Sequence, residues 1–196
     1  MINASASKLH WNYFIALERD LDAVSRYIEF APPNFDVYSI EMAHLLFAAA
    51  SEADVLAKLL CSQVNPSAAR ANIDHYRAAL MPSLPQLATI QVSVARHGLT
   101  MTPWENWGTG TNPDWWTSYN KVKHERNSNF NQATLKNALN ALGALLILNY
   151  EYYRHEMIIN TGSTPKPYDV TGTLEPESTL LRLHGPYYGV YLKARP

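Results

Sequence analysis

The sequence predicts a mainly α-helical protein, with an antiparallel bundle of four to five helices over residues 1–159. Apolar side chains recur at three- and four-residue steps through much of that region, which is the spacing of amphipathic helices. A chain of 196 residues that is 47% apolar can form one domain with a sizeable core. After Asn160, frequent prolines and glycines exclude long helices. We therefore expect residues 160–196 to form a small irregular or β C-terminal appendage packed on the bundle, with a short β-hairpin as one form.

Two long helices are expected in the first third of the chain. The first spans residues 7–30, and the proline pair that follows it forces its end. The second spans residues 36–61, and its alanine-rich middle indicates a central helix, because small side chains let neighbouring helices approach closely. A shorter helix is expected over residues 67–80.

The middle of the chain is expected to be less regular. Residues 89–95 alternate apolar and polar side chains, several of them β-branched, which favours a short strand; an irregular extended segment is the alternative. Residues 98–112 contain proline and two glycines, so they predict a loop. Trp104 and Trp107 are expected to pin this loop to the body of the protein.

Two further helices are predicted before the tail. The first has a typical start, with Asn112 as its cap and Pro113 at its first position. The second is a long apolar helix over residues 132–155. In the tail, residues 187–193 favour a strand, which could pair with residues 179–183 or with the strand predicted in the middle of the chain.

Composition and charge exclude several classes of function. A net charge of −1 argues against general nucleic-acid coating, which needs a surplus of Lys and Arg, although a local basic site is compatible with it. The single cysteine, Cys61, excludes an internal disulfide, and without metal-binding or phosphate-loop motifs we expect no metal and no cofactor. His44 lies in an apolar face and is interpreted as a core histidine. The N-terminus lacks a signal pattern, and the most apolar run, 138–150, is too short and too polar to span a bilayer. We expect a soluble, cytoplasmic protein with no membrane association.

One stretch, residues 115–126 (Trp-Trp-Thr-Ser-Tyr-Asn-Lys-Val-Lys-His-Glu-Arg), brings aromatic, amide, basic and imidazole side chains together. On a helix, Asn120 and His124 project from the same face. An imidazole can take up or release a proton near neutral pH, so His124 is the candidate general acid or base. Nearby cations could hold a phosphate and aromatic rings could stack an unpaired base. The candidates for substrate binding are Lys121, Lys123, Arg126 and Trp116.

The same stretch also has a purely structural interpretation. Its two tryptophans and Tyr119 could belong to the core, and its basic side chains could form a solvated face. From these residues alone, the structural interpretation is the favoured one.

The order of elements, together with two short motifs, resembles the HEPN superfamily. The second helix carries an acid-x-x-x-Lys turn from Asp54 to Lys58, and a Tyr-Asn-x-x-Lys-His motif at residues 119–124 precedes the long apolar helix. The likeness covers residues 8–157. Members of this superfamily are small α-helical bundles, often dimeric, of prokaryotic toxin–antitoxin, phage-defence and RNA-processing proteins. Active members are metal-independent endoribonucleases.

The resemblance implies a role for each motif residue. His124 takes the place of the family's catalytic histidine, and Asn120 takes that of its polar residue. Tyr119 stands where the family has an arginine. A tyrosine offers one hydroxyl and no charge, so the neighbouring basic residues would have to supply the positive charge. Asp54 and Lys58 are the polar pair that the second helix would contribute.

The resulting hypothesis is an RNA-binding homodimer, in the catalytic version a metal-independent endoribonuclease that acts on single-stranded RNA. The alternative is a catalytically inactive bundle that binds a protein partner through Trp104, Trp107 and the C-terminal strand. Burial separates the two hypotheses. If those tryptophans or the tail covered His124 and Asn120, the interaction module would be favoured.

Overall fold

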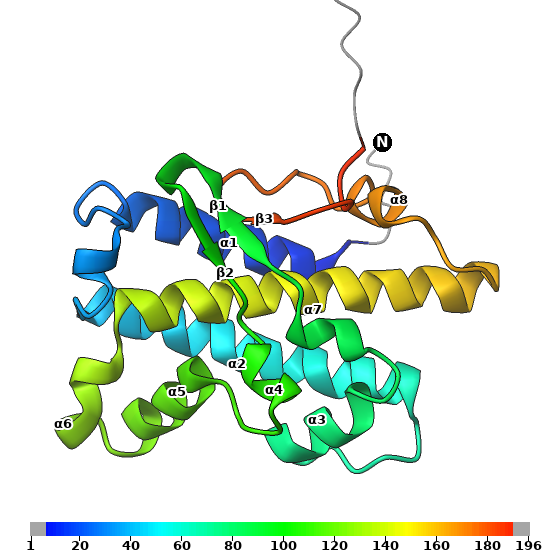
Figure 1. Cartoon of the computed structure of the whole chain (residues 1–196), viewed down its shortest axis with the longest axis horizontal. Coiled ribbons are helices and arrows are strands. Elements are labelled where there is room, and N and C mark those ends of the chain that lie inside the picture. Colours follow the sequence, from blue (N-terminus) through cyan, green and yellow to red (C-terminus); the bar gives the residue numbers. More distant parts are fainter. Residues whose placement is uncertain (1–6, 190–196) are drawn as a thin grey trace, which may run out of the picture.

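The computed structural model describes residues 7–189 of the chain. It is mainly α-helical with a small antiparallel sheet, which confirms the predicted fold class (Figure 1). The helices are α1 (Leu9–Val24), α2 (Ile40–Val64), α3 (Ile73–Leu80), α4 (Glu105–Gly108), α5 (Asp114–His124), α6 (Arg126–Asn129), α7 (Leu135–Thr161) and α8 (Pro167–Thr171). The strands are β1 (Val92–Val94), β2 (Leu99–Met101) and β3 (Arg182–Leu183).

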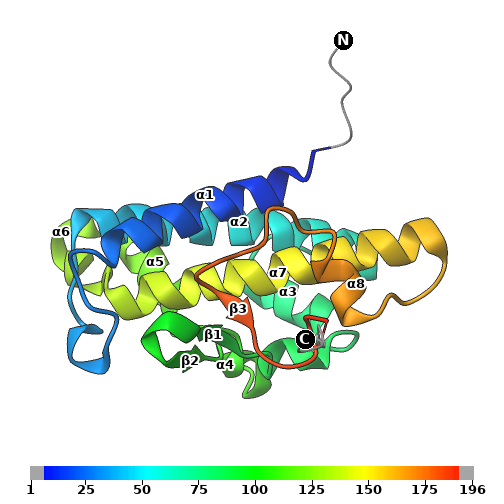
Figure 2. The same ribbon diagram turned by 90° about the horizontal axis from the view of Figure 1, so that it is seen from above.

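The two longest helices, α2 and α7, lie side by side at the centre (Figures 1 and 2). Just before their first turns, Tyr38 and Thr134 form an antiparallel bridge, and the Leu135 N–H donates to the Val37 carbonyl at 2.9 Å. Both helices therefore begin at the same end of the molecule and run parallel. In an antiparallel bundle neighbouring helices run in opposite directions. Here α2 and α7 run in the same direction, because the chain between them, residues 65–134, returns to the end where α2 began.

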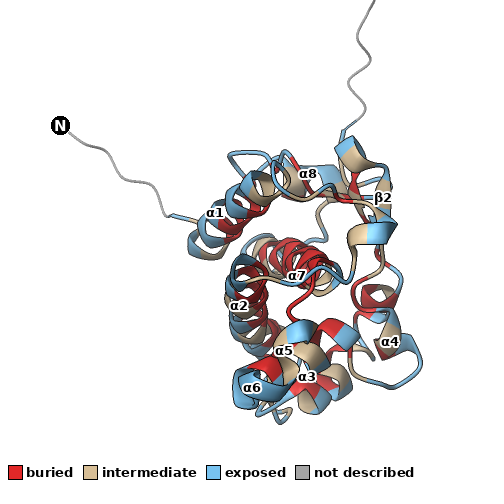
Figure 3. Ribbon diagram, turned by 90° about the vertical axis from the view of Figure 1, so that its left-hand side faces the viewer, coloured by how far each residue is buried: buried red, intermediate tan, exposed pale blue. Residues whose placement is uncertain are grey.

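Two other helices, α1 and α5, run opposite to this central pair (Figures 1 and 2). Figure 3, which views the molecule from one end, shows α7 in the middle, with α1, α2, α5 and the sheet around it. Between Ala138 and Glu151, every side chain of α7 except that of Asn140 is buried. A helix that is apolar on all sides needs such a central position.

Side-chain caps decide where three of the helices begin. Ser39, Asn72 and Thr134 each accept a hydrogen bond from a backbone N–H three residues on, at 3.0–3.2 Å. Such caps satisfy donors that have no partner within the helix. As a result α2, α3 and α7 begin three to six residues after their predicted starts at residues 36, 67 and 132.

Other boundaries also differ from the predicted ones. Asn112 does not cap α5: Pro113 occupies the cap position, and the Asn112 side chain accepts a hydrogen bond from Arg77 at 3.1 Å. The first helix ends at Val24, six residues before the predicted end, and the chain continues in a turn. α7 extends to Thr161 and ends where Gly162 adopts the left-handed backbone conformation (φ 69°) that terminates many helices.

The small sheet has β1 at its centre, in the order β2-β1-β3, with both pairs antiparallel. Val92 is opposite Met101 in β2 and Leu183 in β3. The strand predicted over residues 89–95 is therefore present in a shorter form. The sheet packs on α7 at Gly143, where an added Cβ would stand 3.0 Å from Pro103 Cγ and 3.2 Å from Met101 Sδ.

The segment after α7 belongs to the main hydrophobic core, to which it contributes Val170, Leu174, Leu180, Leu181 and Leu183. The Trp11 indole N–H donates to the Pro176 carbonyl at 3.0 Å, which fastens this segment to α1. Of the strand predicted over residues 187–193, residues 187–189 are not in a strand and the others lie outside the described residues. The tail instead contributes β3 to the sheet.

Two predictions about single side chains have opposite outcomes. Trp104 and Trp107 are buried, with ring centroids 4.2 Å apart, so they anchor residues 98–112 as predicted, although this segment contains β2 and α4 and is not a continuous loop. The prediction of a core histidine at position 44 is wrong. His44 is exposed, with Nδ1 3.8 Å from the Glu41 carboxylate, because it lies on the outer face of α2. Among the described residues, no helix has the length and apolar character needed to cross a bilayer.

Candidate functional site: a basic corner at α5 and α6

Four basic side chains lie exposed where α5 ends and α6 begins, at the left-hand end of Figure 1. We call this group the basic corner, and its members are Lys121, Lys123, His124 and Arg126. Three of them occupy the last turn of α5. Cations are favourable there because the carbonyl end of a helix carries partial negative charge. Arg126 lies beyond that helix, in α6.

Aromatic rings hold two of these cations against the body of the protein. The ammonium of Lys123 lies 5.3 Å from the centre of the Tyr119 ring, and the guanidinium of Arg126 lies 5.2 Å from that of Phe47. The Phe47 and Tyr119 rings meet edge to face, with centroids 6.0 Å apart. The cations are therefore ordered over an aromatic surface while their charges face solvent.

Asn120 and His124 share one face of α5, as predicted from their spacing. Asn120 is half-buried, and its amide nitrogen donates one N–H to the Trp116 carbonyl at 3.1 Å, which leaves the second N–H and the oxygen for a ligand. His124 is the last residue of α5 and is exposed. Within residues 7–189 its ring takes part in no hydrogen bond, so both nitrogens are open to an incoming molecule. Trp104 and Trp107 lie in the core and do not cover Asn120 or His124.

The predicted aromatic members of the site are buried. Trp116 packs edge to face between Trp115 and Tyr119, with centroid distances of 5.6 Å to each ring. Tyr119 lies beneath Lys123. These side chains support the surface from below, and their ring faces are not available for stacking a base.

Asp54 and Lys58 lie elsewhere on α2. They form an ion pair with one another, and Asp54 also accepts a hydrogen bond from the Tyr76 hydroxyl at 2.7 Å. Val122 in α5 packs with Ala43, and Asp54 follows Ala43 by eleven residues, which is about 16 Å along a helix. The structure therefore does not bring this pair together with His124.

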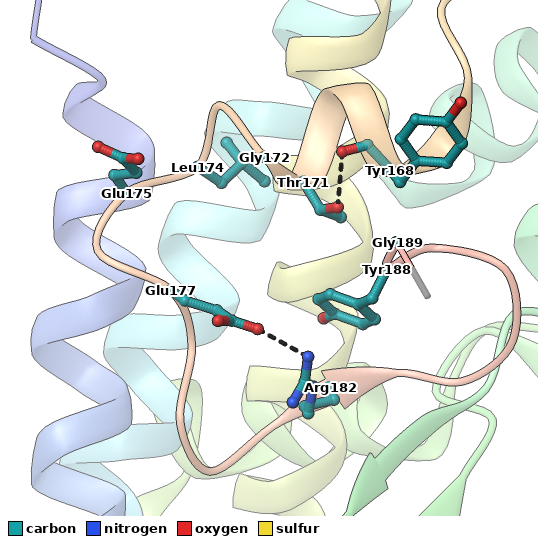
Figure 4. A pocket seen from close by; sticks show the side chains of 9 residues that line it. All are labelled: Tyr168, Thr171, Gly172, Leu174, Glu175, Glu177, Arg182, Tyr188 and Gly189. Atoms are coloured by element: carbon teal, nitrogen blue, oxygen red, sulfur yellow. Dashed lines mark hydrogen bonds and ion pairs between the residues drawn. The ribbon is translucent and has the colours of Figure 1, made fainter. Parts of the chain in front are cut away.

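A cavity that the sequence did not indicate lies under α8 and beside β3 (Figure 4). Its volume is about 400 Å³, and its walls include Tyr168, Glu177, Arg182 and Tyr188. Its polar groups are mostly paired with one another. The Arg182 guanidinium lies 4.2 Å from the centre of the Tyr188 ring and 2.7 Å from the Glu177 carboxylate. This internal pairing makes the cavity a weaker candidate than the basic corner, whose cations face solvent.

Two ionisable groups affected by burial lie in the second half of α7. Burial raises the pKa of the Glu151 carboxyl, and the nearby Arg154 and Gln86 oppose that rise in part. Burial also lowers the pKa of His155, as does the adjacent Arg154. The carboxylate of Glu151 pairs with Arg154 at 3.0 Å and accepts from Gln86 at 3.2 Å. This cluster joins α7 to the turn at residues 85–88 and is a structural contact.

No candidate metal site emerges from the described residues, in which no three His, Cys, Asp or Glu side chains are grouped as metal ligands. Comparisons with protein-family models, with curated proteins and with solved structures each found no match for the chain.

Proposed function

We propose that the basic corner binds single-stranded RNA, in a HEPN-like protein of prokaryotic defence or toxin–antitoxin systems. The observation that carries the proposal is the row of four exposed basic side chains within six residues, two of them ordered over aromatic rings. Lys and Arg side chains arranged in this way can each contact a phosphate, and ordering them in advance lowers the entropy lost on binding. The net charge of −1 for the whole chain fits a local site of this kind.

The proposal extends to metal-independent cleavage, with His124 as the proton-transfer group. In that reaction the ribose 2′-oxygen attacks the adjacent phosphorus and loses its proton, while the bond to the 5′-oxygen breaks and that oxygen gains one. The reaction therefore needs one group that takes a proton and one that gives a proton. A single corner supplies one exposed imidazole, so a homodimer with two corners would supply both. Lys123 and Arg126 replace the charge of the family's arginine, which Tyr119 lacks.

Binding is tested by fluorescence anisotropy with a labelled 12-nucleotide single-stranded RNA in EDTA, over a series of salt concentrations. We expect the double variant Lys123→Gln/Arg126→Gln to bind more weakly and to show a smaller salt dependence, by about 0.7 in the logarithmic slope for each lost phosphate contact. The matched control is Arg19→Gln/Lys166→Gln, which removes two exposed cations elsewhere, one of them also over a tyrosine ring. Equal affinities for the two double variants, or no binding by the unmodified protein, would contradict the proposal.

The oligomeric state tests the catalytic part separately. Light scattering of the purified protein is expected to give twice the 22.1 kDa mass of the chain. A protein that stays monomeric across the concentrations at which it cleaves RNA would rule out a reaction shared between two corners.

The alternative of an inactive interaction module loses the anchors first assigned to it. Trp104 and Trp107 are buried, and the Trp104 indole N–H donates to the Ala144 carbonyl at 3.3 Å, so neither ring can reach a partner. The C-terminal strand assigned to this alternative, residues 187–193, is not a strand at residues 187–189, and its other residues lie outside the described part of the chain. The strand that the tail does form, β3, pairs with β1.

A further inference from the structure

We infer that Tyr38 is a base-stacking residue of the same site and gives it a preference for unpaired nucleotides. This inference rests on the proposed function, because it assigns a second contact to the RNA bound at the basic corner. Tyr38 lies just before α2 and is 50% exposed. Proteins bind single-stranded nucleic acids by combining exposed aromatic rings with cations, with phosphates on the cations and a base on each ring.

The backbone at and before Tyr38 is held in place by the segment at the start of α7. Tyr38 itself bridges to Thr134, and the carbonyls of Val37 and Phe35 accept hydrogen bonds from the N–H groups of residues 135 and 136 at 2.9 and 3.1 Å. A ring on such a support loses little freedom when a base stacks on it, so more of the stacking energy remains as affinity.

The ring of Tyr38 packs against one other aromatic ring in the described part of the chain. The ring of Phe130 meets it edge to face, with centroids 5.7 Å apart and an angle of 87° between the planes. This contact fixes the orientation of the Tyr38 ring. The exposed half of Tyr38 is left for a planar ligand.

Aromatic packing connects Tyr38 to the basic corner. Phe130 packs on a small core of three side chains, Ala43, Val122 and Ala133, and Phe47 packs on the same core. Phe47 carries Arg126, as described above. A series of side-chain contacts therefore links Tyr38 to the corner. It passes from Tyr38 to Phe130, through this core to Phe47, and ends beneath Arg126. We infer that an RNA strand with a phosphate on Arg126 extends over the outside of this packing to Tyr38.

Stacking accounts for selectivity as well as affinity. Every base has an aromatic face, so the contact tolerates any sequence, but a base-paired duplex keeps those faces covered. The site should therefore prefer single strands to a duplex of the same sequence. Phosphate contacts at the basic corner alone would not provide that preference.

The test compares three substitutions in the anisotropy assay with the 12-nucleotide RNA. We expect Tyr38→Ala to weaken binding about 5- to 20-fold, the lower part of the range found for loss of one stacked base, and Tyr38→Trp to keep it. Tyr27→Ala is the matched control, because Tyr27 is 83% exposed and lies in the turn after α1, and it should leave the affinity unchanged. Thermal melting of each variant confirms that it is folded.

A second readout locates the contact directly. RNA that contains 4-thiouridine is irradiated in complex with the unmodified protein, and the adduct is mapped by mass spectrometry to the peptide that contains Tyr38. If Tyr38→Ala binds as tightly as the unmodified protein while Lys123→Gln/Arg126→Gln binds weakly, the stacking role is overturned and the RNA-binding function stands. If the unmodified protein binds no RNA, both are overturned.

Discussion

The buried carboxylate of Glu18 in α1 accepts a hydrogen bond from the hydroxyl of Ser178, 160 residues further along the chain. The same carboxylate accepts the backbone N–H groups of Thr179, Leu180 and Leu181 at 3.1, 3.0 and 2.8 Å. One acidic side chain thus satisfies a run of consecutive donors that would otherwise be buried without partners. This contact fixes the tail against α1 just before β3 joins the sheet.

Replacing Glu18 with glutamine should destabilise the whole protein. Glu18→Gln keeps the size of the side chain but turns one acceptor oxygen into a donor that faces N–H groups, so we expect a loss of about 2–4 kcal/mol. For a chain of this length that corresponds to a fall in Tm of roughly 5–15 °C. Differential scanning calorimetry measures it, with Glu105→Gln at an exposed position as the control. Similar melting temperatures for both variants would contradict the role assigned to Glu18.

Glu151 should make stability depend on pH in a defined direction. Burial raises the pKa of its carboxyl in the folded protein above the ordinary value of 4.5. Between those two pKa values the folded state binds more protons than the unfolded state, so the free energy of unfolding falls as pH rises through that window. Below pH 4.5 this contribution to stability is fully present. Urea unfolding at a series of pH values measures it.

The variant Glu151→Gln has no carboxyl to titrate at this position. Its free energy of unfolding should therefore change less between pH 4.5 and neutrality than that of the unmodified protein. A parallel pH dependence in the two proteins would show that another group is responsible.

Gly143 should tolerate no large side chain. Its position on α7 lies against Pro103 and Met101, and only the flexible methionine can yield easily. We expect Gly143→Leu to cost about 1–3 kcal/mol or more, because the sheet must move away from the helix. Ala16→Leu, at an exposed position of α1, should change the free energy of unfolding by less than about 0.5 kcal/mol. Chemical denaturation of both variants compares them, and equal stabilities would mean that the sheet does not pack as described.

His124 should matter for cleavage far more than for binding. We expect His124→Ala to abolish RNA cleavage in EDTA while its affinity for RNA falls only about two-fold, since three other basic side chains of the corner remain to contact phosphates. His44→Ala is the matched control, because His44 is also an exposed histidine on a helix. Gel analysis of labelled RNA follows the products. If cleavage by His124→Ala equals that of the unmodified protein, the activity belongs to another group or to a contaminant.

Local periodicity in the sequence predicted the helices well, because the side-chain spacing of an amphipathic helix is a property of the chain itself. Periodicity gave wrong predictions where tertiary contacts determine which face of a helix is buried. His44 lies among apolar neighbours in the sequence but on the outer face of α2, and the first helix, predicted to reach residue 30, ends at Val24. Caps such as Thr134 also depend on a side-chain geometry that spacing alone does not fix.

The candidate site was predictable only in part. Sequence placed Asn120 and His124 on one helix face, since residues four apart always share a face. From its residues alone the stretch favoured a core position for Trp116, and Trp116 is buried. Sequence could not show that Asp54 lies about two helical turns from Phe47, the α2 residue beneath Arg126. Those outcomes depend on how α5 packs on α2.

By itself, the sequence determined the mainly α-helical class, the long central helices and the basic stretch at residues 121–126, because each is encoded by local spacing and composition. Only the tertiary structure decided that α2 and α7 run parallel, and that their starts bring Tyr38 against Phe130, 92 positions later in the chain. Contacts between such distant residues follow from the path of the chain between them and from the burial of a shared core, and neither is encoded in local periodicity.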